Sequence, residues 1–162
     1  MNRFPGMLLW MVLAIGIHVL LPHVAWSDES KGQERLAYYE LTRIRSLSKP
    51  GITYHEYRDA LVRPREYVGL LTDGSSETVG LLRKAMGYYD QALDIWGLEA
   101  VSDFPVDSLR TDEPHGAAIL KECPNISRFH YKERDQIYVL DAVDCLWNKA
   151  ADVLGRVPAD LH

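Results

Sequence analysis

Apolar residues recur at steps of three and four through most of this chain, and that spacing places side chains on one face of an α-helix. One regular series is Val79, Leu82, Met86, Tyr89, Leu93 and Trp96. No segment alternates apolar and polar residues for long enough to predict a β-strand. The sequence therefore predicts an all-α fold.

Caps and helix breakers mark the ends of the first two predicted helices. The first covers about residues 34–48, with Ala37, Leu41 and Ile44 on one stripe, and Pro50 and Gly51 end it. The second covers about 53–72 and opens with a capping box formed by Thr53 and Glu56. Its apolar stripe continues through Pro64, so we expect one kinked helix here.

The third predicted helix covers about residues 75–97, with Ser75 or Ser76 as its N-cap. The periodicity is then lost over 98–124, where only a short helix near 117–122 is expected. The fourth predicted helix, about 127–155, is the longest. Together these segments predict a four-helix bundle with a long, disulfide-tethered connection between helices three and four.

Helical geometry divides the predicted fourth helix into three faces. The expected core seam consists of Phe129, Leu140, Val143, Trp147, Ala150 and Leu154. The expected acidic face consists of His130, Glu133, Asp141, Asp144, Asn148 and Asp152. Tyr131, Tyr138 and Cys145 share the third face, so we expect the disulfide to cross the back of this helix with both tyrosines packed beneath it.

The N-terminal segment has the three parts of an export signal. Arg3 precedes an apolar run over 7–21, and the small residues Ala25 and Ser27 precede Asp28. We interpret 1–27 as a signal peptide and 28–162 as a single helical-bundle domain in the periplasm or outside the cell. The alternative is a retained membrane anchor, because the apolar stretch approaches the roughly 20 residues that a bilayer needs.

The two cysteines of the chain, Cys123 and Cys145, both follow the expected signal peptide. Thiols in an oxidising compartment pair by default, so we predict a disulfide between them. Its closure would stabilise the fold by about 3 kcal/mol in the chain-entropy description. No C-x-x-C motif occurs, and this excludes a thioredoxin-like redox centre and a c-type haem attachment.

Charge and motifs argue against several classes of function. The chain has 18 Lys and Arg against 23 Asp and Glu, for a formal net charge of −5, which disfavours nucleic acid and, after signal cleavage, membrane surfaces. It has no phosphate-binding loop and no G-x-S-x-G motif, so we assign no catalytic residue and no cofactor.

Two groups of potential metal ligands are interpreted as solvated surface. His130 and Glu133 form a single His-x-x-Glu, whereas di-metal bundles need Glu-x-x-His on two helices. The cluster Asp112, Glu113 and His115 has no second motif to complete a metal site. The sequon at Asn125 is interpreted as a chance match at a helix start.

Aromatic residues at helical spacing are the remaining functional signal, and the candidates for ligand or partner binding are Tyr54, Tyr57, Tyr89, Trp96 and Trp147. We expect a non-enzymatic binding or interaction module whose partner is a protein or a small apolar ligand. One alternative is a small-ligand carrier with an aromatic pocket inside the bundle. A metal-dependent enzyme is the third.

We predict that the exported chain begins at Asp28, because Ala25 and Ser27 are the small residues that a signal peptidase selects. N-terminal sequencing of the exported protein measures this directly. A chain that still carries Arg3 would contradict the prediction and favour the membrane anchor.

Overall fold

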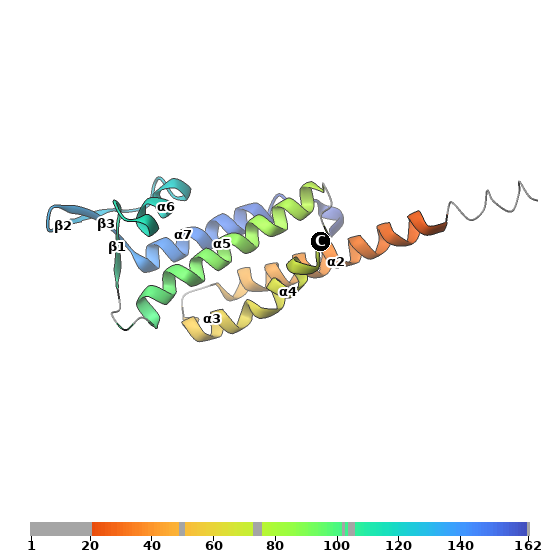
Figure 1. The fold of residues 1–162 in the computed structure, drawn as a ribbon, viewed down its shortest axis with the longest axis horizontal. Coiled ribbons are helices and arrows are strands. Elements are labelled where there is room, and N and C mark those ends of the chain that lie inside the picture. Colours follow the sequence, from red (N-terminus) through yellow and green to blue (C-terminus); the bar gives the residue numbers. More distant parts are fainter. Residues whose placement is uncertain (1–20, 49–50, 73–75, 102, 104–105, 162) are drawn as a thin grey trace, which may run out of the picture.

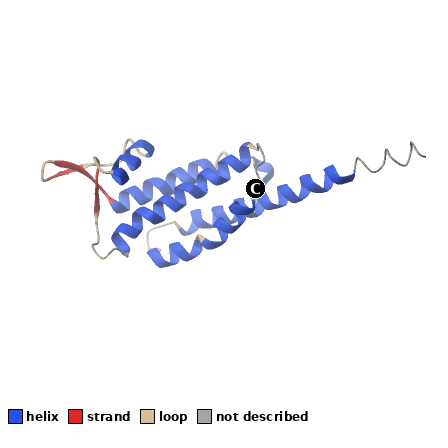
Figure 2. Cartoon of the chain, viewed as in Figure 1, coloured by secondary structure: helices blue, strands red, loops and turns tan. Residues whose placement is uncertain are grey.

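The computed structural model describes residues 21–48, 51–72, 76–101, 103 and 106–161. Over these ranges the protein is mostly helical with one small sheet (Figure 2). The predicted helical fold is therefore confirmed in its main feature. The sheet departs from the all-α expectation: strands β1 (Ser108–Arg110), β2 (Phe129–Tyr131) and β3 (Arg134–Tyr138) pair antiparallel in the order β1-β3-β2.

The first described helix, α2 (Leu21–Leu47), includes the segment predicted for 34–48 and begins well before it. Ala37, Leu41 and Ile44 are fully buried, as their spacing predicts. Most of the expected signal peptide, at 1–20, lies outside the described residues, and the expected cleavage point falls within α2. None of the helices in the described ranges is both long enough and apolar enough to cross a membrane.

The predicted kinked helix is divided into α3 (Tyr54–Ala60) and α4 (Val62–Leu70), which meet at Leu61. The capping box at its start is present. The Glu56 amide donates to the Thr53 hydroxyl at 3.2 Å, and the Thr53 amide donates to the Glu56 carboxylate at 2.9 Å. The Thr53 hydroxyl also lies 2.8 Å from the same carboxylate oxygen, and the hydrogen bonds from the Thr53 amide and hydroxyl hold the pKa of the Glu56 carboxyl below its usual range.

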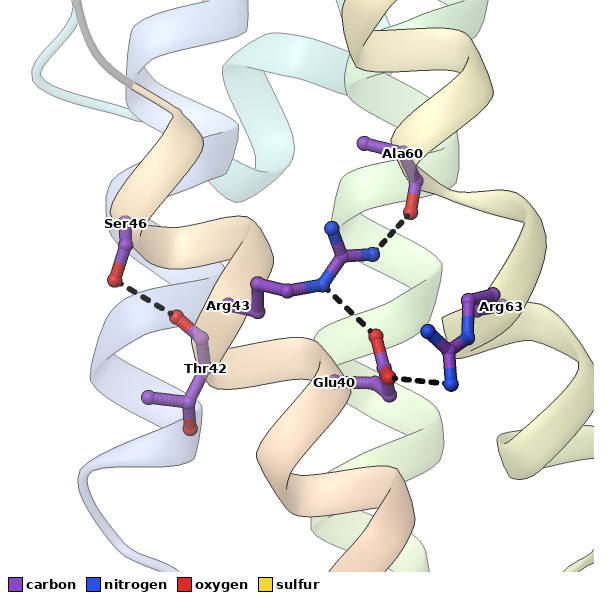
Figure 3. Close-up of polar contacts among 6 residues, drawn as sticks. All are labelled: Glu40, Thr42, Arg43, Ser46, Ala60 and Arg63. Atoms are coloured by element: carbon purple, nitrogen blue, oxygen red, sulfur yellow. Dashed lines mark hydrogen bonds and ion pairs between the residues drawn. The ribbon is translucent and has the colours of Figure 1, made fainter.

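A polar cluster joins α2 to the break between α3 and α4 (Figure 3). Pro64 has no N–H to donate to the Ala60 carbonyl, and a guanidinium nitrogen of Arg43 in α2 donates to that oxygen at 3.4 Å. The same guanidinium donates to Glu40 at 2.9 Å, and Arg63 lies 3.5 Å from the other Glu40 oxygen. Within the described ranges Glu40 is the only charged residue that is buried, and the two arginines compensate its charge.

Helices α5 (Glu77–Ala100) and α7 (Val139–Leu154) lie side by side and share the most extensive contact between any two elements (Figure 1). The Ser76 hydroxyl caps α5 by accepting from the Val79 amide at 3.4 Å. The predicted stripe from Val79 to Leu93 is buried, and Trp96 is half-buried. Helix α5 continues one turn past Gly97, the expected end.

The predicted fourth helix is wrong in its first third, because residues 129–138 form the β2–β3 hairpin and α7 begins only at Val139. The core face predicted for this helix is also partly wrong, because the prediction treated the hairpin residues as helical. Leu140 is 50% exposed rather than in the seam, and Phe129 lies on a strand. The face that α7 buries consists of Val139, Ala142, Val143, Leu146, Ala150, Val153 and Leu154.

The predicted disulfide between Cys123 and Cys145 is present. It ties the C-terminal end of α6 (Pro114–Glu122) to α7, so the long connection is tethered as expected. Tyr131 and Tyr138, expected beneath the disulfide, are instead about half exposed on the hairpin. A short 3₁₀ helix, η1 (Ala159–Leu161), ends the described chain.

Leu82→Ala should destabilise the protein by about 2–5 kcal/mol, because Leu82 is fully buried and its removal leaves a cavity in the core. Leu140→Ala removes the same atoms from a half-exposed position and should change the free energy of unfolding by less than about 0.5 kcal/mol. Chemical denaturation of both variants measures the difference. Equal losses in the two variants would mean that the buried face of α7 has been assigned incorrectly.

Candidate functional site

The sheet has a buried face and an outward face, because side chains alternate along each strand. Leu109 pairs with Ile137, and both side chains are buried against the rest of the protein. The neighbouring pairs Ser108 with Tyr138 and Arg110 with Gln136 lie on the opposite face. β2 adds Phe129 and Tyr131 to the same face, since Phe129 also pairs with Gln136.

This outward face forms the floor of a cavity of about 710 Å³, which we call the sheet-end cavity. The sheet and α6 lie at the end of the helical part where α5 ends and α7 begins (Figure 1). The floor consists of Ser108, Arg110, Phe129, Tyr131, Gln136 and Tyr138. The walls come from the end of α5, the approach to β1 and the start of α6, through Leu98, Val106, Asp107, Glu113, His115 and Gly116.

Aromatic rings occupy much of the cavity floor. The rings of Phe129 and Tyr138 are stacked, with their centroids 4.3 Å apart and an interplanar angle of 19°. Tyr138 nevertheless remains 49% exposed, and Tyr131 is 53% exposed. The Lys132 ammonium lies 5.1 Å from the centroid of the Tyr131 ring, within the range of a cation–π contact. The stacking on Phe129 orients the Tyr138 ring, and both tyrosine rings remain accessible.

The positive charge of the cavity is neutralised within the site. The Arg110 guanidinium pairs with Asp112 at 2.7 Å and with Glu113 at 2.8 Å. Hydrogen bonds from Arg110 hold the pKa of the Asp112 carboxyl below its usual range. Two carboxylates thus share one guanidinium, and Arg110 has little attraction left for an anion. Close by, the Ser108 hydroxyl hydrogen-bonds to the Gln136 side-chain oxygen at 2.6 Å.

The wall formed by α6 depends on a glycine. A Cβ atom at Gly116 would lie 2.1 Å from the Arg110 carbonyl oxygen, so only glycine allows α6 to approach β1 this closely. The Glu113 amide donates to the same carbonyl at 3.1 Å, which joins the start of α6 to the end of β1. The disulfide holds the other end of α6.

Four of the five aromatic residues proposed from the sequence meet at the edge of the helical core, where Tyr57 is buried and the other three are half-buried. Neighbouring rings among Tyr54, Tyr57, Trp96 and Trp147 have centroids 5.3–6.0 Å apart. The Tyr57 hydroxyl donates to the backbone carbonyl of Tyr89 at 3.0 Å, and burial raises the pKa of both phenols. None of these five residues lines the sheet-end cavity.

Of the acidic face predicted for the fourth helix, only the four residues that belong to α7 lie together. Asp141, Asp144, Asn148 and Asp152 border a second cavity of about 520 Å³ beside the disulfide. Burial, followed by repulsion from Asp141, raises the pKa of the Asp144 carboxyl. In the described ranges, no group of three or more His, Cys, Asp and Glu side chains is arranged to hold a metal ion.

The remaining predicted surface groups lie around the sheet. His130 and Glu133 are on the hairpin instead of sharing a helical face with the aspartates. His130 Nδ1 lies 3.1 Å from an Asp135 carboxylate oxygen, and both side chains are exposed. Of the cluster at 112–115, Asp112 and Glu113 pair with Arg110, and His115 lines the cavity.

Sequence reasoning missed the aromatic residues of the cavity floor. Phe129 and Tyr131 are two residues apart, and this spacing puts them on one face of a strand. On a helix, two residues at this spacing point to different faces. The Phe-x-Tyr alternation is therefore the signal in the sequence that corresponds to the cavity floor.

Comparisons of the chain with models of protein families, with curated proteins and with solved structures found no match. Function is therefore inferred from the geometry of the site.

Glu133→Gly should stabilise the hairpin. Lys132 and Glu133 form its two-residue turn with φ of 47° and 63°, a left-handed conformation that costs a residue with a side chain about 1 kcal/mol and glycine almost nothing. Amide hydrogen exchange over 129–138 should slow about fivefold. Glu133→Ala keeps the strained backbone and is the matched control, so equal slowing in both variants would contradict the explanation.

Proposed function

We propose that the protein is an exported, non-enzymatic binding module whose ligand occupies the sheet-end cavity. The observation that carries this proposal is the cavity itself, which combines exposed aromatic rings with polar groups. Its volume of about 710 Å³ lies within the roughly 300–1,000 Å³ typical of ligand pockets. Aromatic rings supply contact area, and the few polar groups around them would orient a ligand.

In this proposal the helices pack as a four-helix bundle that serves as the scaffold. A binding face placed at the end of a rigid core keeps its geometry when the ligand leaves. The disulfide is consistent with an oxidising compartment, and therefore with the proposed periplasmic or extracellular location.

The polar groups of the cavity favour binding over catalysis. The Ser108 hydroxyl is bonded to an amide oxygen, which is too weak a base to activate it as a nucleophile. The Asp112 and Glu113 carboxylates are both engaged by Arg110, and hydrogen bonds from Arg110 lower the pKa of the Asp112 carboxyl, which disfavours the proton-donating form of a general acid there.

The alternative of a carrier with an aromatic pocket inside the bundle has less support. Tyr57, Trp96 and Trp147 contact one another edge-on or tilted, so they fill the space that such a pocket would need. Tyr57 is fully buried, and Trp96 and Trp147 are half-buried against it, whereas Tyr131 and Tyr138 on the sheet are exposed.

Native mass spectrometry of the protein purified from its own host tests the binding function. We expect a bound ligand on the unaltered protein that is lost from Tyr138→Ala, because this variant removes an exposed ring from the cavity floor. Tyr39→Ala is the matched control, since Tyr39 is an exposed tyrosine on α2. Equal ligand occupancy in the unaltered protein and in Tyr138→Ala would contradict the proposal.

A further inference from the structure

We infer that the ligand of the sheet-end cavity is an uncharged saccharide, an inference that rests on the proposed binding function and adds the class of ligand. A sugar ring has two kinds of surface. Its faces carry C–H groups, and its edges carry hydroxyls. A site for it therefore needs an accessible aromatic ring beside groups that both donate and accept hydrogen bonds.

The aromatic requirement is met by Tyr138 and Tyr131. The face of an aromatic ring is the negative side of its quadrupole, so it attracts the weakly positive hydrogens of sugar C–H groups. Stacking on Phe129 fixes the orientation of the Tyr138 ring, and about half of that residue remains accessible. Because both tyrosines lie on one sheet face, they would not need to rearrange to receive a ring.

The hydrogen-bonding requirement is met by the groups between and around the rings. Gln136 supplies an amide and Ser108 a hydroxyl on the floor, and His115 supplies an imidazole from the wall. The Ser108 hydroxyl donates to the Gln136 oxygen, so Ser108 offers the ligand an acceptor and the Gln136 NH₂ group offers donors. A neutral imidazole adds one donor and one acceptor, and a sugar hydroxyl, which both donates and accepts, can pair with either kind of group.

The charges of the cavity disfavour an anionic ligand, so among saccharides they favour those without acidic groups. The Arg110 guanidinium is paired with two carboxylates, so a phosphate or carboxylate ligand would have to displace Asp112 or Glu113. Asp107 adds a further negative charge to the wall, which disfavours anionic ligands. A purely apolar ligand is disfavoured as well, because it would strip water from Gln136, Ser108 and the carboxylates without replacing it.

The test is a ¹H–¹⁵N NMR titration of the full chain, expressed with its own N-terminal segment and with the disulfide intact. The probes are maltotriose, cellotriose and chitotriose, with inorganic phosphate and an uncharged peptide as comparisons. We expect at least one oligosaccharide to shift amides over 108–110 and 129–138, while phosphate leaves them unchanged. Tyr138→Ala should weaken that binding at least tenfold, and Tyr39→Ala should not change it.

Gln136→Ala separates stacking from hydrogen bonding, since it removes the amide and retains both tyrosines. It should also weaken oligosaccharide binding, and the chemical shifts of residues outside the sheet report whether each variant remains folded. If the peptide or phosphate shifts the sheet amides and no oligosaccharide does, the saccharide inference is overturned and the binding function stands. If the protein from its host carries no ligand and no probe shifts the sheet amides, both are overturned.

Discussion

The close packing of α5 against α7 is the contact on which the rest of the structure depends. Both helices bury alanines, and Ala85, Ala92, Ala142 and Ala150 are all fully buried. Small side chains let the two backbones approach closely, so the larger residues beside them interlock. Because β3 leads directly into α7 and β1 pairs with β3, the position of this helix pair also fixes the sheet.

The helical part could be predicted from the sequence because several independent signals agree there. In α3 and α4 the capping box, the apolar stripe and the proline all indicate a kinked helix starting near Thr53. In α5 the Ser76 cap and the stripe from Val79 indicate the same start. Where local chemistry and long-range packing favour the same structure, that structure can be predicted from a single sequence.

The sheet, and with it the candidate site, could not be predicted for two physical reasons. β1 and β2 have three residues each, which is too few to establish an alternation, and β3 buries only Ile137 fully. The turn between β2 and β3 uses Lys132 and Glu133 in left-handed conformations that normally require glycine or asparagine. The hairpin is therefore held by its pairing with β1 and not by its own turn residues.

The disulfide links one wall of the cavity to the redox state of its surroundings. One end of α6 forms that wall, and the other end is joined to α7 by the disulfide of Cys123 and Cys145 and to α5 by the hydrogen bond from the Tyr88 hydroxyl to Glu122. Reduction would remove only the covalent link to α7, because the start of α6 is held against β1 by the Glu113 amide and the close approach of Gly116. The far end of α6 would then gain freedom to move while the residues that line the cavity stay anchored to the sheet, so the disulfide limits motion of this wall and does not determine its place.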